Sequence, residues 1–83
     1  MTAYTATVEV RLKHSVLDPE AETTGRALER LGFELEDLRA ADLFEVDLEA
    51  ESAEDAAERA GEMAERLLAN PTIHDYEVTV EER

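Results

Sequence analysis

The sequence predicts an α+β fold, a two-layer ferredoxin-like sandwich with the element order β-α-β(β)-α-β. Three observations predict it. Apolar and polar residues alternate in several segments, which is the period of a half-buried strand. Two other segments repeat apolar residues every three or four positions, as one face of a helix does. Residues that favour helix ends bound both of these segments. We expect a mostly antiparallel sheet with both helices on one face, in a single domain over residues 1–83.

The first strand is predicted by strict alternation near the N-terminus. Its polar positions include Thr5, Thr7 and Glu9, which would face away from the core. Its apolar positions are Tyr4, Ala6, Val8, Val10 and Leu12.

The first helix is predicted to begin after Asp18, a favoured N-cap residue, with Pro19 at the first helical position. Gly32 stands where a left-handed C-terminal cap is expected. One face of this helix has the spacing of a buried stripe. That stripe consists of Thr24, Ala27, Leu28 and Leu31.

The middle segment, residues 35–50, is predicted to be extended, with apolar residues at even positions. It forms either one long strand bent near Ala41 and Asp42, or two strands joined by a tight turn there. The pattern alone leaves both arrangements open. The apolar even positions are Leu38, Ala40, Phe44, Val46, Leu48 and Ala50.

The second helix is predicted to begin after Ser52 as N-cap, with Asp55 completing a weak capping box, and to stop at Asn70-Pro71. Its many alanines indicate that it lies close to the sheet. Its inner face is expected to be Ala56, Ala60, Met63, Ala64, Leu67 and Leu68. A final strand follows, with Tyr76, Val78 and Val80 facing inward. The open face of the sheet would carry Thr7, Glu9, Glu45, Asp47, Glu49, Glu77 and Thr79.

Charge excludes two classes of partner. The chain has 22 acidic against 8 basic residues, a formal net charge of −14. Such a surface repels nucleic acid and anionic membranes, because binding to both depends on Lys and Arg.

The acidity also indicates adaptation to high salt. Lys13 is the only lysine and alanine is abundant, so we expect the protein to come from a halophilic organism. No segment has the roughly 20 apolar residues of a membrane span, and the N-terminus lacks a signal-peptide pattern, so we expect a cytoplasmic protein.

The sequence predicts no catalytic, cofactor-binding or metal-binding residue on this chain. There is no cysteine, and His14 and Ser15 are neighbours whose side chains point apart on an extended segment. His14 and His74 lack the i, i+4 spacing of a helical zinc motif. The three glycines are scattered and build no phosphate-binding loop.

Several short segments occur in a characteristic order and spacing. They are Val16-Leu17-Asp18-Pro19, then Gly25-Arg26-Ala27-Leu28-Glu29-Arg30-Leu31-Gly32, and Leu67-Leu68-Ala69-Asn70-Pro71-Thr72-Ile73-His74-Asp75-Tyr76. With them the sequence resembles the PurS family, the small subunit of phosphoribosylformylglycinamidine (FGAM) synthase, from the first strand to Val80. It departs from the family pattern at Ser15, where a Gly is common, and in residues 38–42, where Asp42 replaces a Lys.

The resemblance implies a function. The complex converts formylglycinamide ribonucleotide, ATP and glutamine into formylglycinamidine ribonucleotide, ADP, phosphate and glutamate in de novo purine synthesis. A PurQ-like glutaminase releases ammonia, and a PurL-like synthetase uses ATP and Mg²⁺ to activate the substrate. The PurS-like subunit is a non-catalytic homodimer or higher oligomer that bridges the two and supports ammonia transfer.

Two exposed segments of fixed shape are the candidate contacts with these partners. One is Val16, Leu17, Asp18 and Pro19, and the other is Asn70, Pro71, Thr72 and Ile73. Alternatively, the residues of both segments serve only to begin or to end a helix. An alternative function is a stand-alone regulatory domain that binds a small effector at a dimer interface.

Overall fold

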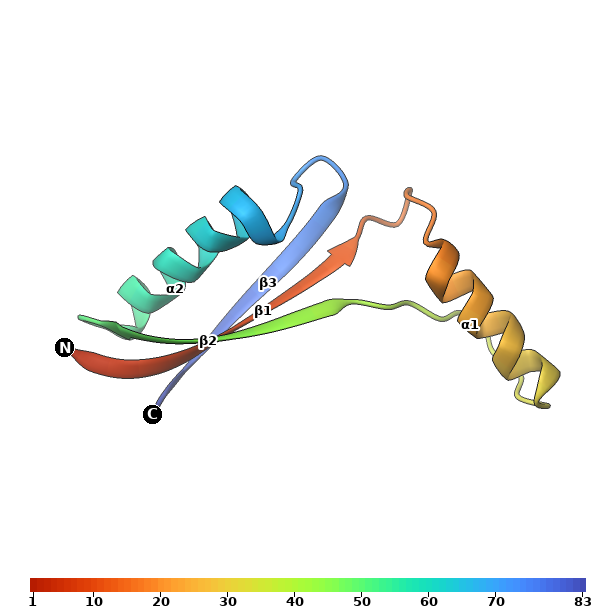
Figure 1. Cartoon of the computed structure of the whole chain (residues 1–83), viewed down its shortest axis with the longest axis horizontal. Coiled ribbons are helices and arrows are strands. Elements are labelled where there is room, and N and C mark those ends of the chain that lie inside the picture. The colour runs from red at the N-terminus through yellow and green to blue at the C-terminus, as the bar shows by residue number, and fades with distance from the viewer.

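The computed structural model describes all 83 residues as an elongated molecule, with principal extents of 51 × 27 × 16 Å (Figure 1). A three-stranded sheet and one helix occupy one part of its length, and a second helix lies beyond the end of the sheet. The elements in chain order are β1 (Thr2–Leu12), α1 (Pro19–Arg30), β2 (Asp42–Ala50), α2 (Ala53–Met63), a π-helical turn (Ala64–Leu68) and β3 (His74–Glu82).

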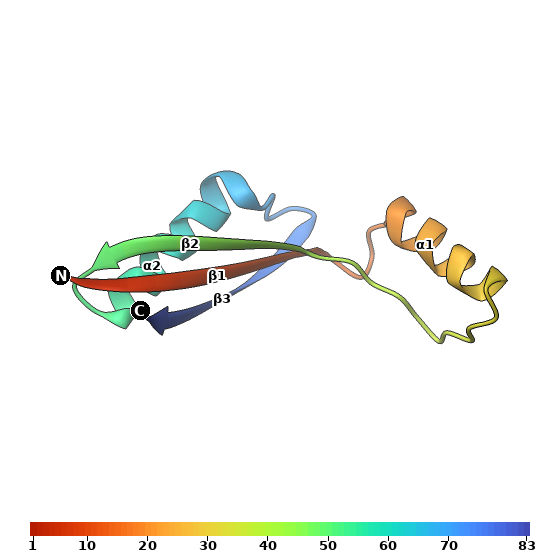
Figure 2. The same cartoon turned by 60° about the horizontal axis from the view of Figure 1, so that its bottom comes forward.

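The sheet is antiparallel, with the strand order β2-β1-β3 (Figure 2). The central position of Val8 illustrates the register, since it lies between Phe44 on β2 and Val78 on β3. All three side chains face α2, as the alternation predicted. The α+β class and the ferredoxin-like arrangement of an antiparallel sheet with helices are therefore confirmed, with β2 and β3 as open edges.

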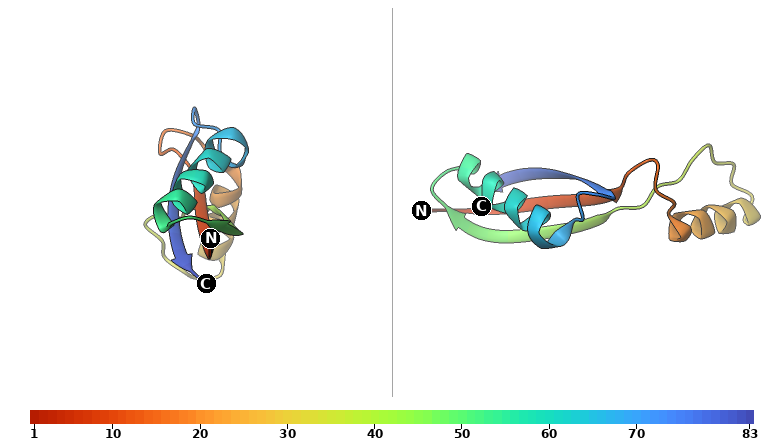
Figure 3. Two further views of the ribbon diagram at one scale, coloured as in Figure 1. Left: turned by 90° about the vertical axis from the view of Figure 1, so that its left-hand side faces the viewer. Right: turned by 90° about the horizontal axis from the view of Figure 1, so that it is seen from above.

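The core lies between the sheet and α2. Ala6 and Val8 of β1 are fully buried, as are Ala60 and Ala64 at the C-terminal half of α2 and in the turn that follows. Because alanine side chains are short, the helix axis approaches the sheet closely, as the sequence predicted. The view along the molecule shows α2 lying along one face of the sheet (Figure 3). Only 10 of the 83 residues are buried, so this core is small.

The expectation that both helices cover one face of the sheet is wrong for α1. Figures 1 and 2 place α1 beyond the end of the sheet, and it packs on neither face. Its only buried residue is Ala21, and the predicted buried stripe is largely exposed, with Leu31 75% exposed. The reason is the long extended segment after the helix, which keeps α1 at a distance from the sheet.

The middle segment forms neither of the two predicted arrangements. Strand β2 begins only at Asp42, opposite Val10, and residues 33–41 pair with no strand. No turn is present at Ala41 and Asp42. The β1–β2 ladder stops at the Val10–Asp42 pair, and beyond Leu12, where β1 ends, residues 33–39 have no neighbouring strand with which to form a ladder. Leu38 and Ala40 consequently lie outside the sheet.

The end of α2 differs from the predicted regular helix. Ala69 N–H donates to the Ala64 carbonyl at 2.7 Å, closing an i→i+5 turn. This wider turn shifts the face of the helix, so that Leu67 is 84% exposed instead of packing inward, and Met63 is partly exposed. Leu68 keeps its place against the core. Asn70-Pro71 ends the helix as predicted.

The predicted helix caps are confirmed. The Asp18 carboxylate accepts from Ala21 N–H at 3.2 Å, and the Ser52 hydroxyl accepts from Asp55 N–H at 3.1 Å. Gly32 has φ of +100°, in the left-handed region that favours glycine. The ends of both helices were thus readable from the sequence.

The open face of the sheet carries the predicted polar residues. Thr7 lies across from Glu45 and Thr79, and Glu9 lies across from Glu77. This face is acidic along most of its length.

Candidate partner-contact surface

The two candidate contact segments lie at the same end of the sheet, where β1 ends and β3 begins. Lys13, which precedes the first segment, donates its N–H to the Ile73 carbonyl of the second segment at 2.9 Å. The Lys13 Nζ also lies 3.7 Å from an Asp75 carboxylate oxygen. Parts of the chain that are more than fifty residues apart in the sequence are therefore tied together at this end of the sheet.

The first segment has a rigid entry into α1. Val16 N–H donates to the Lys13 carbonyl at 2.9 Å, which closes a turn before the helix. Asp18 and Pro19 have the local roles of N-cap and first helical residue. Leu17 has no such role, and its side chain is 77% exposed. Leu17 is therefore the member of this segment that local structure does not account for.

The second segment is a compact turn organised by Asn70. Its side-chain oxygen accepts from Thr72 N–H at 3.0 Å, and its backbone carbonyl accepts from Ile73 N–H at 3.0 Å and from His74 N–H at 2.7 Å. The Asn70 N–H in turn donates to Nδ1 of His74 at 2.9 Å, which requires that nitrogen to be unprotonated. Thr72 is exposed and Ile73 half-buried, so the turn presents a fixed shape to the outside.

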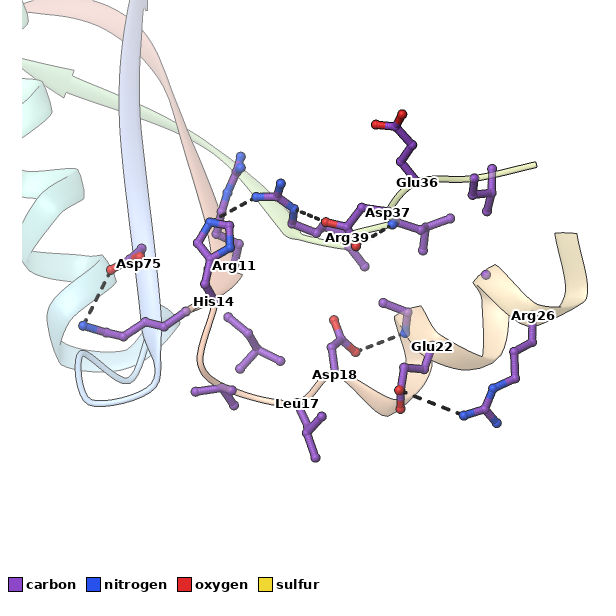
Figure 4. Close-up of a pocket in the computed structure, with 18 of the residues that line it drawn as sticks. Arg11, His14, Leu17, Asp18, Glu22, Arg26, Glu36, Asp37, Arg39 and Asp75 are labelled. Atoms are coloured by element: carbon purple, nitrogen blue, oxygen red, sulfur yellow. Dashed lines mark hydrogen bonds and ion pairs between the residues drawn. The ribbon is translucent and has the colours of Figure 1, made fainter. Parts of the chain in front are cut away.

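Beside these segments a groove of about 510 Å³ lies between the end of β1, α1 and the extended segment before β2 (Figure 4). Of the predicted contact residues, Val16, Leu17 and Asp18 line this groove, whereas Pro19 and the turn at residues 70–73 do not. Asp75, directly after that turn, does line it. The first segment and the start of β3 are thus brought together, and the 70–73 turn flanks them.

Basic residues that the sequence did not mark as partner contacts form one wall of the groove. Figure 4 shows Arg11, His14 and Arg39 side by side. The Arg39 Nη1 lies 3.1 Å from Nε2 of His14, and its Nε donates to Asp37 at 3.0 Å. The sequence did indicate a locally basic region, since Arg11, Lys13 and His14 are close together in an otherwise acidic chain.

One titratable group beside the core is perturbed. The Tyr76 hydroxyl donates to a Glu65 carboxylate oxygen at 3.0 Å, and this bond raises the pKa of Tyr76, with smaller contributions from burial and from the negative charge of Glu65. The bond ties β3 to the π-helical turn.

Two further observations concern metals and membranes. No group of three or more His, Asp or Glu side chains is arranged to hold a metal ion. No helix has both the length and the apolar character that a membrane span requires.

Known proteins resemble the chain over almost its whole length. The family model described as "PurS: Phosphoribosylformylglycinamidine (FGAM) synthase" matches residues 5–82. The chain belongs to the PurS family. Curated PurS subunits of FGAM synthase are similar: the Methanocaldococcus jannaschii subunit is 44% identical, covering 94% of this chain and 95% of that protein. The Bacillus subtilis subunit is 40% identical, covering 95% and 94%.

Solved structures of PurS proteins share the fold. The crystal structure of M. jannaschii PurS superimposes with a TM-score of 0.86 at 42% identity, covering 96% of this chain and 98% of that one. A chain of the PurLQS structure from Thermotoga maritima superimposes with a TM-score of 0.86 at 33% identity, covering all of both chains. The elongated shape with α1 beyond the sheet is therefore shared with PurS proteins. The resemblance seen in the sequence motifs is confirmed, and it favours the subunit role over the effector-binding alternative.

Proposed function

We propose that this PurS-family chain is the bridging subunit of FGAM synthase in de novo purine biosynthesis, linking a PurQ-like glutaminase to a PurL-like synthetase. The observation that carries the proposal is the match over the full length of both chains to a subunit of the T. maritima PurLQS structure. Curated relatives from archaea and bacteria bear the same subunit name, which supports it. The proposal carries with it a cytoplasmic location, where this biosynthesis takes place.

In this role the chain supplies surfaces rather than reacting groups. The synthetase would hold ATP and Mg²⁺ and convert formylglycinamide ribonucleotide, with ammonia from the glutaminase. Ammonia that escapes into water near neutral pH is mostly protonated and diluted, so holding the two active sites together raises its effective concentration at the second site. We propose that both candidate segments, Val16–Pro19 and Asn70–Ile73, contact these large subunits.

The two serine hydroxyls and His14 support a non-catalytic role. The Ser52 hydroxyl is occupied as a helix cap, and Ser15 lies in the exposed turn before α1. His14 Nε2 faces the guanidinium of Arg39 rather than a hydroxyl that it could activate. These arrangements provide no nucleophile with an adjacent base.

Self-association is part of the proposal. Both sheet edges are open, and open edges favour pairing with another chain. Apolar side chains at and just after the C-terminal end of α1 are uncovered in the single chain, with Leu31 75% and Phe33 58% exposed. A second chain that covers the sheet edges and these apolar side chains would increase the buried apolar surface. This burial stabilises a domain whose own core is small. A homodimer or higher oligomer therefore fits the single chain's exposed surfaces.

The experiment that tests the function is reconstitution. The purified chain is mixed with its glutaminase and synthetase in molar KCl, and the mixture is analysed by light scattering with size-exclusion chromatography. We expect a complex containing all three subunits, and glutamine-dependent synthesis that requires this chain. Synthesis from glutamine that proceeds equally well without the chain would contradict the bridging role, while ammonia-dependent synthesis by the synthetase alone serves as the control.

A further inference from the structure

The turn that leads into β3 is closed by two hydrogen bonds between the same two residues. The His74 N–H donates to the Asn70 carbonyl at 2.7 Å, and the Asn70 N–H donates to Nδ1 of the His74 ring at 2.9 Å. Both distances are those of ordinary hydrogen bonds from an N–H group. The Asn70 N–H makes no other hydrogen bond, so the ring of His74 alone satisfies it.

This bond determines the protonation state of the His74 ring. A backbone N–H can only donate, so Nδ1 accepts and carries no proton, and the proton of the neutral ring is on Nε2. An imidazolium has a proton on both nitrogens, so a charged ring offers no acceptor in any orientation. Imidazole ordinarily changes its charge between about pH 5 and 8. The bond is therefore present where the ring is neutral and is lost as the pH falls through that range.

The charged groups around His74 offer an imidazolium no partner. Lys13 and Asp75 pair with each other at 3.7 Å, and the alternation of β3 places Asp75 on the opposite face of the sheet from His74. On the side of His74, the Glu65 carboxylate already accepts from the Tyr76 hydroxyl at 3.0 Å. No carboxylate is hydrogen-bonded to the ring or paired with it. The charged and titratable groups of the neighbouring segments are Lys13, Asp75, Glu65, Arg66 and Tyr76.

The bond to His74 is one part of a small network that gives the turn its shape. The Asn70 carbonyl also accepts from Ile73 N–H at 3.0 Å, and the Asn70 side-chain oxygen accepts from Thr72 N–H at 3.0 Å. The Ile73 carbonyl accepts from Lys13 N–H at 2.9 Å, which connects the turn to the end of β1. Loss of the bond from the Asn70 N–H therefore releases the residue on which the other bonds of the turn converge.

We propose that His74 is a positioning residue: its neutral ring holds the Asn70–Ile73 turn in the observed shape, and protonation of the ring releases that shape. The sheet and α2 keep their structure, because no charged or polar side chain is buried in the core. This role goes beyond the proposed function, because it belongs to the single chain. In the proposed complex the same turn is one of the two contact segments, so the large subunits would meet the shape that neutral His74 holds.

The other histidine of the chain provides a comparison. His14 Nε2 lies 3.1 Å from Nη1 of Arg39, so this ring also accepts from a group that can only donate. Both side chains are exposed, and the bond joins two side chains rather than a side chain and the backbone. When His14 is protonated, Arg39 can turn into water without movement of the backbone. Protonation of His14 is therefore expected to leave the Asn70–Ile73 turn unchanged.

The test measures amide exchange by NMR in the full chain without a partner, at one KCl concentration, at about pH 7.5 and about pH 5. Exchange rates are divided into those of an unstructured chain at the same pH, which gives protection factors. We expect the protection of the Asn70 amide to fall about fivefold at the lower pH, the effect of losing one hydrogen bond. The protection of the Val8 amide in the centre of β1 should stay within about twofold.

Three variants separate the role of His74 from a general effect of acid. His74→Asn places an amide oxygen near the position of Nδ1 and does not titrate, so we expect protection of the Asn70 amide at both pH values. His74→Leu has no acceptor, so its protection should be low already at about pH 7.5 and fall no further. His14→Asn is the matched control, and it should keep the pH dependence of the wild-type chain.

Several results would overturn the role of His74. They are equal protection of the wild-type turn at both pH values, a loss at low pH in His74→Asn as large as in the wild type, and a pH dependence abolished by His14→Asn. A parallel loss at Val8 would also overturn it, because acid would then unfold the whole sheet. Since this experiment needs no partner, failure of the reconstitution refutes the proposed function alone.

Discussion

Asp18 has an observed role as a helix cap and a proposed role as a partner contact. Its carboxylate caps α1 by accepting from Ala21 N–H, and it also lines the groove beside Leu17. The capping role depends on an acceptor oxygen, which asparagine also provides, whereas an ionic contact with a partner depends on the negative charge. The pair Asp18→Ala and Asp18→Asn therefore distinguishes the two roles.

We expect Asp18→Ala to raise the amide exchange rates in the first turn of α1 about fivefold, because a lost N-cap costs about 1 kcal/mol. Asp18→Asn should leave these rates nearly unchanged. Amides of β1 should not respond in either variant, because α1 does not pack on the sheet. Hydrogen–deuterium exchange of the isolated chain measures this. Ser52→Ala is the matched control on α2, where the lost cap should also speed exchange in the sheet below. Equal exchange in the two Asp18 variants would contradict the capping role.

At the scale of elements, α2 is the only helix that stabilises the sheet. Its buried positions Ala56 and Ala60 are fully inaccessible, as is Ala64 at the start of the π-helical turn. Short side chains at these positions set the distance between helix and sheet, so a larger side chain there forces the two layers apart.

We expect Ala60→Leu to lower the free energy of unfolding by about 1–3 kcal/mol through overpacking. Ala53→Leu is the matched control, because Ala53 lies on the same helix and is exposed. The control should change stability by less than about 0.5 kcal/mol. Urea unfolding followed by circular dichroism gives both values. A stable Ala60→Leu variant would show that α2 can move away from the sheet without loss.

Features that depend on interactions between residues close in the sequence were predicted correctly, whereas features that depend on contacts between distant residues were not. Alternation, caps and helix stops are local, and they predicted β1, β3 and the starts of α1 and α2. The position of α1 is not local. Its stripe ending at Leu31 has the spacing of a buried face whether the covering surface belongs to the same chain or to another one.

The remaining differences have the same origin. The period of two in residues 35–50 indicates extended backbone, but only pairing with β1 decides where a strand begins, and that pairing stops at Asp42. The π-helical turn that exposes Leu67 has no composition of its own that would reveal it. For the contact surface, the motifs led to Val16, Leu17 and Asp18, whereas the basic wall joins Arg11 and Arg39 through tertiary structure.

At the scale of the whole molecule, the dominant quantity is the net charge of −14 on a small, elongated body. Self-repulsion at low ionic strength opposes folding, and salt reduces the range of these forces to about 3 Å at 1 M. The acidic open face concentrates this effect, because Glu9 lies directly across from Glu77 in the register of β1 and β3. Like charges in such positions destabilise an antiparallel pair.

The expectation of salt adaptation leads to a prediction for the whole chain and for one residue. We expect the melting temperature of the wild-type chain to rise between dilute buffer and 1 M KCl, as measured by circular dichroism. Glu77→Gln should raise the melting temperature in dilute buffer by a few degrees, corresponding to about 0.5 kcal/mol. In 1 M KCl this gain should become smaller, because salt already screens the repulsion between Glu9 and Glu77 in the wild-type chain. Glu58→Gln is the matched control: it removes one exposed charge from α2, away from the open face, and so changes the net charge equally without relieving the cross-strand pair. The same gain from both variants would mean that total charge, rather than the cross-strand placement of Glu9 and Glu77, limits stability. A wild-type melting temperature that does not change with salt would contradict the adaptation altogether, since a chain with this excess of carboxylates would then be stabilised by packing that screening does not affect.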